Sequence, residues 1–399
     1  MINNDTLKEI TYLAGNEDTI LGMPDVPALQ PFSDMMIKFL GDVSKKIMSD
    51  KGNFLYHDVV TFAFWIRAAS LNRMKKKHSS EIFRLGRGVA FHIAPSNVPV
   101  NFAYSLVSGL LTGNANIVRV PSKEFKQVDI IANAFKSTLN EHMEIRPYIA
   151  LIKYDHSKAV NDVLSGMANV RIIWGGDATI ASLRESPLPP RSTEILFADR
   201  FSLSVIDADI YMDIVNKSAV ADGFYNDTYL TDQNACTSPR IVVWHGERKD
   251  EAKNEFWKYL HTIVKKKYSL QDMQAVNKLA SSYLAAVGLG DLQIIPTGDN
   301  LITRIYLEKM DAQIPNLIDN SGFFFEYDCD DPIELWDVCN NVKCQTVGVI
   351  GDKMWIMPLI EKGIKGIDRV VDVGHTIDFE LIWDGYDLCN ALTRNVVVS

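Results

Sequence analysis

Cys236 is the residue of this sequence that is best placed to take part in a chemical reaction. It lies in the polar stretch Asp232-Gln-Asn-Ala-Cys-Thr-Ser-Pro-Arg240, just before a strand predicted over 240–244. Cysteine is the best nucleophile that a protein offers near neutral pH once its thiolate is stabilised. Small polar neighbours in a loop suit an exposed, positioned sulfur. The alternative is a buried structural cysteine, which is how we interpret the other four: Cys329, Cys339, Cys344 and Cys389.

An α/β framework is predicted to position this loop. The first 80 residues are expected to be helical, with apolar residues at helical spacing over 32–40 and 59–71. Strands and helices then alternate: strand 88–95, helix 100–111 with Gly113 suited to its left-handed cap, strand 115–120, helix 127–139, strand 148–154, helix 157–167, strand 170–174, then strand 240–244 and helices 249–267 and 269–286. Such alternation predicts mostly parallel sheets covered by helices.

Three loops are expected at one edge of the first sheet, because ligands of open α/β sheets bind at the carboxyl ends of strands. These loops are Pro95-Ser-Asn, Pro121-Ser-Lys and Gly175-Gly-Asp. Gly175 and Gly176 allow the backbone to approach a pyrophosphate, and the helix N-terminus that follows favours negative charge. The spacing differs from the G-x-G-x-x-G fingerprint, so it does not by itself define a dinucleotide site.

The chain length predicts two domains, since 399 residues exceed what one core normally supports. We place the boundary near residue 222. Residues 1–222 then hold the helical N-terminus and a dinucleotide-binding domain, and residues 223–370 hold the cysteine domain. The segment 371–399 is left unassigned.

Composition excludes several classes of protein. A net charge of −9 argues against a general nucleic-acid binder. The polar N-terminus is unlike a signal peptide, and the most apolar run, 102–111, is too short to span a bilayer, so we expect a cytoplasmic protein without integral membrane contact. The five cysteines form no C-x-x-C pair, which argues against a disulfide framework or a structural zinc site, and we predict no metal.

Four motifs resemble the aldehyde dehydrogenase superfamily in order and spacing over residues 86–240. The segment 86–99 is similar to a superfamily motif that consists of a glycine, an apolar strand and the sequence Pro-Trp-Asn-x-Pro. The segment from Thr112 to Lys123 is similar to the superfamily motif Gly-Asn-x-x-x-x-Lys-Pro-Ser-Glu. Trp174-Gly-Gly-Asp177 resembles the Phe-Thr-Gly-Ser turn, and residues 232–240 resemble the stretch that holds the catalytic cysteine. This surrounding motif favours the nucleophile over the structural reading for Cys236 alone.

Within that superfamily the sequence resembles the acyl-CoA reductases of the LuxC type, from luminous bacteria and their relatives. The matching stretches are 233–239, Gln345-Thr-Val-Gly-Val349 and Val373 to Gly385. The resemblance implies an α/β, aldehyde-dehydrogenase-like fold of two doubly wound domains with the active site between them. It also implies NADPH-dependent reduction of an acyl-CoA, or another activated acyl thioester, to an aldehyde through an acyl-enzyme on Cys236.

The resemblance also implies roles for individual residues. Asn97 and the backbone N–H of Cys236 would bind the oxyanion, although asparagine between two prolines is also a turn residue. Lys123 replaces the usual glutamate and, with Arg119, favours NADPH over NADH by charge. The implied cofactor set is Pro95, Ser96, Arg119, Ser122, Lys123, Gly175, Gly176 and Asp177, and the implied substrate rim is Gln233, Asn234 and His375. His92, in mid-strand, is interpreted as a core histidine.

The sequence departs from the superfamily at the general base. Phe197 stands where the dehydrogenases have a glutamate, and Asp199 and Arg200 stand where they have two glycines. Without that base, water competes poorly for the acyl-enzyme, which favours exchange with a thiol and hydride delivery. Glu194 or Glu326 could still supply a carboxylate from elsewhere.

Three alternatives stay open at this point. One is an aldehyde dehydrogenase with a relocated base, and another is a reductase of acyl phosphates. The third is a non-catalytic subunit that holds an acyl group or scaffolds an acyl-protein synthetase. The expected partners are an acyl-CoA or acyl-carrier substrate, such a synthetase and further copies of the chain, and no nucleic acid.

Overall fold

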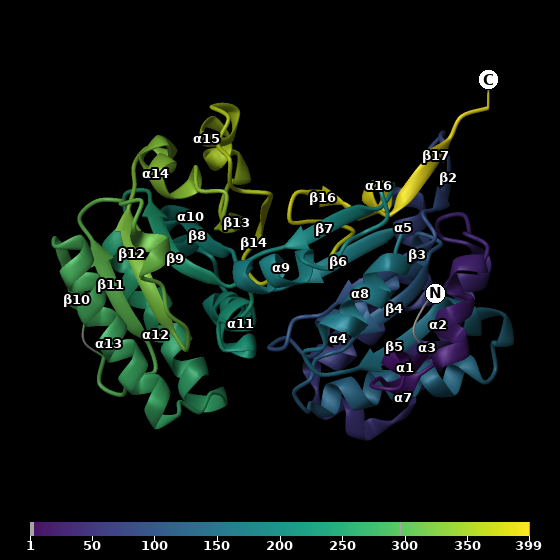
Figure 1. Cartoon of the computed structure of the whole chain (residues 1–399). Helices are drawn as coiled ribbons and strands as arrows, with labels where there is room; N and C mark the ends of the chain where they lie inside the picture. The colour runs from purple at the N-terminus through teal and green to yellow at the C-terminus, as the bar shows by residue number, and fades with distance from the viewer. Residues whose placement is uncertain (1–3, 296, 399) are drawn as a thin grey trace. The chain divides into compact units, whose positions relative to one another are not determined.

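The computed structural model describes residues 4–295 and 297–398, and the chain divides into two compact units (Figure 1). Unit 1 runs to Ala198 and resumes at Tyr386, and unit 2 is Asp199–Gly385. The expected boundary near residue 222 falls inside helix α11 (Lys217–Thr228) of unit 2. It lies too late because β8 (Phe201–Asp207) already pairs with strands of unit 2. The unassigned segment 371–399 divides between the units after Gly385.

A mostly parallel sheet forms the centre of unit 1. Its order within the described residues is β1-β5-β4-β3-β6-β7, with only the edge strand β1 antiparallel to its neighbour. The strands are β1 (Thr11–Ala14), β3 (Val89–Ile93), β4 (Ala115–Arg119), β5 (Ile149–Lys153), β6 (Val170–Trp174) and β7 (Thr193–Phe197). Every residue of β3 and β6 is buried, as expected for parallel strands covered on both faces. The predicted strands near 88–95, 115–120, 148–154 and 170–174 are thus confirmed.

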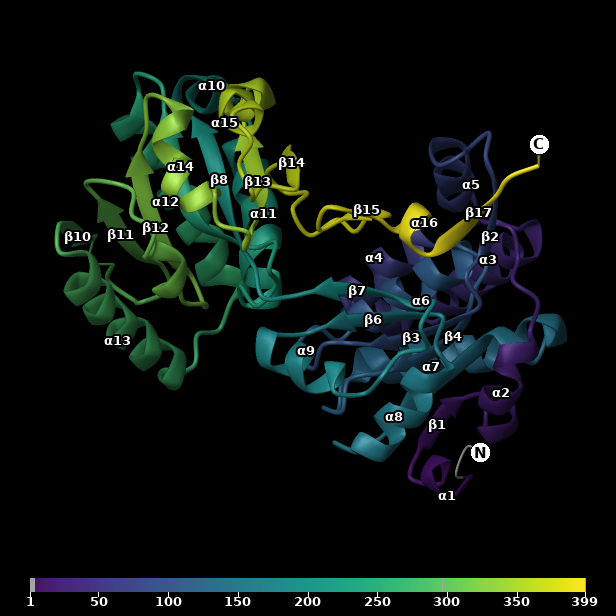
Figure 2. The ribbon, with the colours of Figure 1, turned by 45° about the horizontal axis from the view of Figure 1, so that its top comes forward.

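Helices surround this sheet (Figure 2). They are α1 (Asn4–Leu7), α2 (Glu17–Gly22), α3 (Asp34–Ser49), α4 (His57–Trp65), α5 (Ala68–Lys77), α6 (Asn101–Leu111), α7 (Lys126–Leu139), α8 (Lys158–Met167), α9 (Asp177–Arg184) and α16 (Leu388–Ala391). A separate pair, β2 (Phe83–Gly86) and β17 (Thr393–Val396), ties the C-terminal segment to this unit. No helix of the described residues is both long and apolar enough to cross a membrane.

The all-helical expectation for the first 80 residues is wrong in two places. Residues 11–14 form β1, which pairs with β5. The helix expected over 59–71 is interrupted between α4 and α5, where Arg67 is extended. The break is stabilised by Ser70, whose hydroxyl donates to the Phe64 carbonyl at 3.1 Å and accepts from Arg67 Nε at 3.0 Å. Helical spacing of apolar residues continues across the break, so the pattern did not reveal it.

A second mostly parallel sheet forms the centre of unit 2. Its order within the described residues is β10-β11-β12-β9-β8-β13-β14, with only β10 antiparallel to its neighbour. The remaining bounds are β9 (Pro239–His245), β10 (Leu292–Ile295), β11 (Thr303–Leu307), β12 (Phe323–Asp328), β13 (Cys344–Ile350) and β14 (Arg369–Asp372). Its helices are α10 (Ala208–Asp213), α11, α12 (Lys249–Lys267), α13 (Asp272–Leu289), α14 (Trp336–Cys339) and α15 (Met357–Glu361).

The strands of unit 2 send alternate side chains to its two faces. Ile241 and Val243 of β9 pack with side chains of α13, α14 and α15, whereas Val242 and Trp244 pack with α10, α11 and α12. This follows the two-residue period of a strand. The sheet therefore has an apolar layer on each side, which accounts for the continuous apolar sequence of β9.

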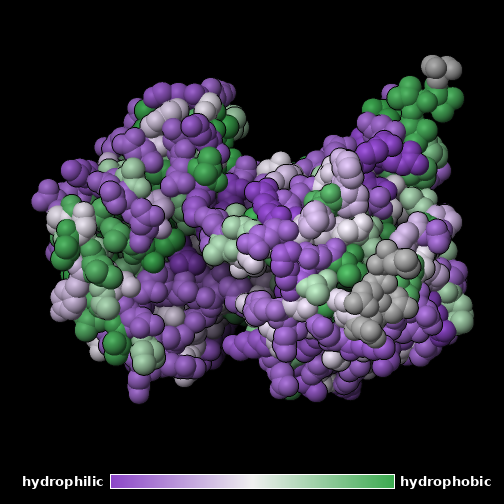
Figure 3. All heavy atoms as spheres, in the orientation of Figure 1, coloured by the Kyte–Doolittle hydropathy of each residue, from purple (hydrophilic) through white to green (hydrophobic). Residues whose placement is uncertain are grey.

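Helix α13 turns its polar face toward the protein and its apolar face outward. Lys278 is 2% exposed and donates to the carbonyl oxygens of Asn300 and Ser321, while Gln274 donates to Asp232 at 2.7 Å. The apolar side chains on the outer face are all exposed: Met273, Val276, Leu279, Tyr283, Leu284 and Val287. Hydrophobic residues gather over α13 and β10 in Figure 3. Polar contacts to Asp232, in the loop that holds Cys236, and to the carbonyl oxygens of Asn300 and Ser321 thus fix the rotation of this helix.

Gly113 forms the left-handed cap that the sequence predicts after α6. Its φ is +84°, and a Cβ at this position would run into the carbonyl oxygen of Leu29. We expect Gly113→Ala to lower the free energy of unfolding by about 2 kcal/mol or more, measured by urea denaturation. The matched control is Gly166→Ala inside α8, where no atom lies near the added Cβ and the change should stabilise by about 0.5–1 kcal/mol. Equal effects of the two changes would contradict this assignment.

Candidate active site

Cys236 lies in a tight loop between the short helix Tyr229–Thr231 and strand β9 of unit 2. Asp232 and Gln233 open this loop in the left-handed region, with φ values of 54° and 53°. Two consecutive side chains of this kind in that region cost energy, so surrounding contacts must hold them there. Cys236 is half-buried, and its carbonyl accepts a hydrogen bond from Ser202 Oγ at 2.8 Å.

Gln233 supplies most of the contacts that hold the loop. Its side chain is fully buried, and its amide oxygen accepts from the N–H groups of Gly322 at 2.7 Å and Phe323 at 3.0 Å. Its amide nitrogen donates to the carbonyl of Pro239 at 3.0 Å. The expectation that Gln233 lines a substrate rim is therefore wrong. Because both ends of its amide are used inside the protein, the residue is a structural anchor.

The two other residues of the expected rim are exposed. Asn234 lies at the surface, where its side-chain oxygen accepts from Asn320 Nδ2 at 2.9 Å. His375 bonds Asp378 at 2.7 Å, and this hydrogen bond raises the pKa of the imidazole. His375 follows Gly374, whose N–H donates to the buried carboxylate of Asp227 at 2.6 Å. Both residues are accessible, and neither is shown to contact Cys236.

The thiol of Cys236 has charged neighbours of both signs. Burial and the carboxylate of Asp384 raise its pKa to about 11, against the opposing effects of Gln345 and Arg200. Arg240 and Arg369 also feel the charge of this cysteine. The thiol is therefore protonated at neutral pH in the free protein, but cationic and hydrogen-bonding groups surround it that would stabilise a thiolate.

A buried polar cluster adjoins the cysteine, and the sequence did not single it out. Arg200 binds Asp384 at 2.7 Å and Asp368 at 2.6 Å, and Gln345 donates to Asp384 at 2.7 Å. Asp384 is 3% exposed at its side chain, and burial raises its pKa to about 6. The sequence held signals of this cluster, namely Arg200 at a position where the resemblance to the superfamily implies a glycine, and the LuxC-like stretches 345–349 and 373–385.

Neither glutamate considered as a replacement base is available. Glu194 binds Arg171 at 2.6 Å and Arg184 at 2.7 Å in unit 1. Glu326 is fully buried in unit 2, where it accepts from Trp257 at 2.7 Å and Arg304 at 2.6 Å. The ring of Phe197, which the sequence resemblance places at the glutamate position of the dehydrogenases, stacks on Trp174 with centroids 3.6 Å apart. The carboxylates that the sequence left open are thus bound in structural ion pairs.

Unit 1 brings the three predicted loops together at one edge of its sheet. Strand β3 lies between β4 and β6, and all three run parallel, so the loops that follow them share one edge (Figure 2). Ser96 and Asn97 are exposed after β3, with Pro95 half-buried, and Ser122 and Lys123 are exposed after β4. Gly175 and Gly176 are half-buried, and Asp177 begins α9. This arrangement fits the carboxyl-edge site of a dinucleotide.

Arg119 and Lys123, the two basic residues at this edge of the sheet, differ in whether their charged groups are already in contact with other parts of the protein. The guanidinium of Arg119 lies over the Tyr154 ring at 4.5 Å and donates to the Tyr154 carbonyl at 3.2 Å, so it is already occupied. Lys123 is exposed beside the ring of Phe125 at 5.3 Å. His92, by contrast, is confirmed as a core histidine: it bonds Ser105 at 2.7 Å and Asn116 at 3.0 Å, and burial lowers its pKa to about 4.

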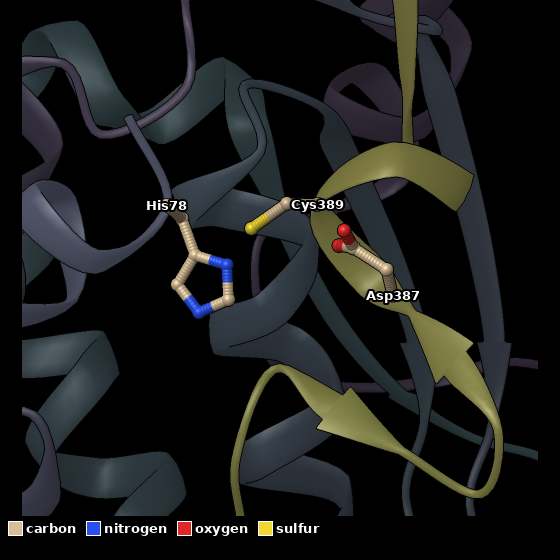
Figure 4. A group of neighbouring side chains, drawn as sticks. All are labelled: His78, Asp387 and Cys389. Carbon is tan, nitrogen blue, oxygen red and sulfur yellow. The ribbon is translucent and has the colours of Figure 1, made fainter. Parts of the chain in front are cut away.

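His78, Asp387 and Cys389 form a group of possible metal ligands within the described residues of unit 1, with ligand atoms within 4.8 Å of one another. In Figure 4 one ring nitrogen of His78 faces the other two side chains. However, Asp387 already accepts from the N–H of Asn390 at 3.1 Å, and burial raises the pKa of the Cys389 thiol to about 12, with Arg84 close enough to oppose that rise. A nearby guanidinium disfavours a second cation, so we assign no metal to this group.

The fold is that of the aldehyde dehydrogenases. A salicylaldehyde dehydrogenase from Pseudomonas putida G7 is 14% identical and superposes over 98% of this chain and 88% of its own, with a TM-score of 0.66. A 3,6-anhydro-L-galactose dehydrogenase is 12% identical over 98% and 90% of the two chains, with a TM-score of 0.64. The family model described as acyl-CoA reductase (LuxC) matches residues 23–395, and the chain belongs to this family.

Relatives from luminous bacteria carry the name long-chain acyl-protein thioester reductase. The protein of Aliivibrio fischeri is 28% identical over 181 residues, which are 45% of this chain and 36% of the relative. That of Vibrio harveyi is 27% identical over 196 residues, 47% of this chain and 39% of the relative. The chain thus spans well under half of the length of these curated relatives.

The raised thiol pKa gives a direct prediction for the free protein. Alkylation of Cys236 by iodoacetamide should be slow at pH 7 and should rise about tenfold per pH unit toward pH 11, because only the thiolate reacts. Mass spectrometry of the Cys236 peptide measures the rate at each pH. The buried Cys339 is the internal control and should stay unlabelled while the protein is folded. A rate that is already constant above pH 8 would contradict the prediction.

Proposed function

We propose that this chain reduces an acyl thioester to an aldehyde with NADPH, through an acyl-enzyme on Cys236. The observation that carries the proposal is the setting of Cys236 itself. Its loop is held by the buried side chain of Gln233, the cysteine itself is half-buried, and Arg200, Arg240 and Arg369 interact with its charge. An anchored thiol among cations suits a nucleophile that must form a thiolate and then stabilise an oxyanion.

The first step is acyl transfer. The Cys236 thiol first gives its proton to solvent. The thiolate then attacks the carbonyl carbon of the donor thioester, a new carbon–sulfur bond forms, and the π electron pair of the carbonyl moves to oxygen. Asn97 and the N–H of Cys236 are the proposed donors to that oxyanion. Collapse expels the donor thiolate and leaves the acyl group on Cys236.

The second step is reduction of the enzyme thioester. A bound NADPH supplies a hydride, which is two electrons and one proton. The carbonyl carbon of the acyl group accepts it, and the resulting hemithioacetal oxyanion uses the same donors as the first step. Release of the aldehyde returns the Cys236 thiolate, so atoms and charge balance. The carboxyl-edge loops of unit 1 would hold the dinucleotide, with glycine backbone at the start of α9 facing its phosphates.

Loss of the superfamily's base favours reduction over hydrolysis. Phe197 and Trp174 form a stacked apolar pair where a carboxylate would activate water. Glu194 and Glu326 are held in ion pairs with arginines. An acyl-enzyme without a nearby base persists long enough to be reduced or returned to a thiol, which disfavours an aldehyde dehydrogenase that releases a free acid.

The acyl donor is either acyl-CoA or an acyl group carried on a protein thiol. The family model is named for acyl-CoA, whereas relatives are named for acyl-protein thioesters. We propose a thioester donor of either kind because both present the same carbonyl to Cys236.

The acyl-enzyme is tested without any reducing cofactor. The protein is mixed with radiolabelled acyl-CoAs of several chain lengths, denatured and examined for bound label. We expect label that hydroxylamine releases and that Cys236→Ala lacks, with Cys389→Ala as the matched control that keeps it. Label that persists in Cys236→Ala would exclude this nucleophile. No label from acyl-CoA but label from an acyl-protein would select the protein donor.

Cofactor preference is tested at Lys123. Replacing a cation near a 2′-phosphate with an acid should cost about tenfold or more in kcat/KM for NADPH and should spare NADH, because a charged hydrogen bond contributes about 1.5–3 kcal/mol. Steady-state kinetics of Lys123→Glu with both cofactors measure the ratio. Lys136→Glu, an exposed change on α7, is the control. An unchanged ratio would remove Lys123 from the site.

A further inference from the structure

We propose that Gln345 is a catalytic residue whose amide nitrogen donates a hydrogen bond to the Cys236 sulfur, and that Asp384 is the positioning residue that keeps the nitrogen end of this amide in place. The inference rests on the proposed function, in which Cys236 is the nucleophile. It adds a second side chain that touches the reacting sulfur and a third that controls its orientation.

The orientation of the Gln345 amide follows from the bonds around one oxygen. Arg200 Nη1 and Gln345 Nε2 both lie 2.7 Å from the same oxygen, Oδ1 of Asp384. Arginine can only donate, so this oxygen must accept from it. The Gln345 atom that faces the same oxygen must then be the NH₂ group, since a carbonyl oxygen there would oppose an acceptor. The assignment holds whether or not Asp384 carries a proton on its other oxygen.

The second N–H of that amide is directed to the cysteine. An NH₂ group has two hydrogens, and Asp384 uses one of them. Ser202 joins the two segments, because its hydroxyl donates to the Cys236 carbonyl at 2.8 Å and accepts from the N–H of Thr346, next to Gln345, at 3.2 Å. Gln345 is also the side chain whose hydrogen bonding lowers the pKa of the Cys236 thiol. The amide nitrogen is thus shared between a carboxylate oxygen and the nucleophilic sulfur.

The other end of the amide carries an independent signal. Oε1 of Gln345 is buried and has no hydrogen-bond partner in the described part of the chain, on a side chain with no exposed surface. Leaving a buried acceptor unpaired is costly, and native structures avoid it unless something else requires it. The unpaired Oε1 of Gln345 is a consequence of the amide orientation in which Nε2 faces Asp384 and Cys236.

Asp384 is itself held in an unusual conformation for this task. It has a φ of 56°, a left-handed value that aspartate tolerates better than most residues, and Gly385 follows with a φ of 77°. Arg200 fixes its carboxylate and is in turn bound to Asp368 at 2.6 Å. The order of contacts is therefore Asp368, Arg200, Asp384, Gln345 and finally Cys236.

Asp384 has two opposite effects on the thiol. The negative charge of Asp384 disfavours the thiolate of Cys236. The hydrogen bond between Asp384 and Gln345 favours the thiolate, because it keeps a donor at the sulfur. The charged groups that act on Asp384 are Arg200 and Asp368, and those that act on Cys236 are Asp384, Arg200, Arg240 and Arg369. Charge and positioning can therefore be separated by choosing the substitution.

Asp384→Asn and Asp384→Ala form a matched pair. Both remove the charge, but asparagine can keep an oxygen that accepts from Arg200 and Gln345, whereas alanine cannot. The pH profile of Cys236 alkylation by iodoacetamide is measured for each. We expect the midpoint for Asp384→Asn to fall below that of the unmodified protein, and the midpoint for Asp384→Ala to lie above that of Asp384→Asn. Identical profiles for the two variants would overturn the positioning role.

Gln345→Met tests the donor and does not depend on the stability of an Asp384 variant. Methionine has a similar volume and cannot donate, so alkylation at a fixed pH below the midpoint should slow about tenfold, a shift of about one pH unit. Gln293→Met, the same substitution at an exposed position of β10, should keep the profile of the unmodified protein. A Gln345→Met profile that does not move would overturn the donor role.

The alkylation readout uses neither substrate nor cofactor, so it separates this inference from the proposed function. If the profiles shift as expected while Cys236→Ala still forms aldehyde, the hydrogen bond is real and the proposed function fails. If Cys236→Ala abolishes aldehyde formation and the profiles do not shift, the nucleophile stands and the roles of Gln345 and Asp384 are wrong.

Discussion

The buried amide of Gln233 is the interaction on which the cysteine loop depends. Two left-handed residues in succession would relax if nothing held them, and Gln233 holds them by bonding the N–H groups of Gly322 and Phe323 and the carbonyl of Pro239. These contacts reach the starts of β9 and β12, which are hydrogen-bonded neighbours in the sheet. The position of the sulfur is thereby defined by the sheet rather than by the loop, and a nucleophile placed by rigid elements keeps its geometry during attack.

The same constraint explains why α13 faces inward with its polar side. Gln274 bonds Asp232, Lys278 bonds the carbonyl of Ser321, and Ser281 bonds Asp319 at 2.6 Å, so the helix completes the hydrogen bonds of the cysteine loop and of the segment beside it. Turning the apolar stripe inward would break these hydrogen bonds and leave the buried Lys278 ammonium and the backbone carbonyl of Ser321 unpaired. The inward polar face of α13 is therefore part of the support of the cysteine loop.

The sequence was sufficient for elements whose signal is local. Strand β6 and helix α12 have the predicted bounds, because a buried apolar run and a charged amphipathic stretch each end at clear boundaries. It was insufficient where partners come from distant segments. Nothing local distinguishes Gln233 as an anchor from Gln233 as a rim residue, and the contacts of Asp384 with Arg200 join residues 184 positions apart. The boundary near 222 failed for the same reason, since β8 is assigned to unit 2 by the strands it pairs with.

The charges around Cys236 show why a neutral donor is useful at this sulfur. A guanidinium placed directly on the thiol would lower its pKa strongly, but a stable thiolate is a weaker nucleophile and a better leaving group, which would favour loss of the acyl group before reduction. Arg200 is instead screened by Asp368 and Asp384, and Arg240 and Arg369 are bonded to backbone carbonyl oxygens. The amide of Gln345 then adds a modest, directional stabilisation. A thiol of this kind stays protonated at rest and must give its proton to solvent before it attacks the acyl donor, and the hydrogen bond from Gln345 stabilises the thiolate that remains.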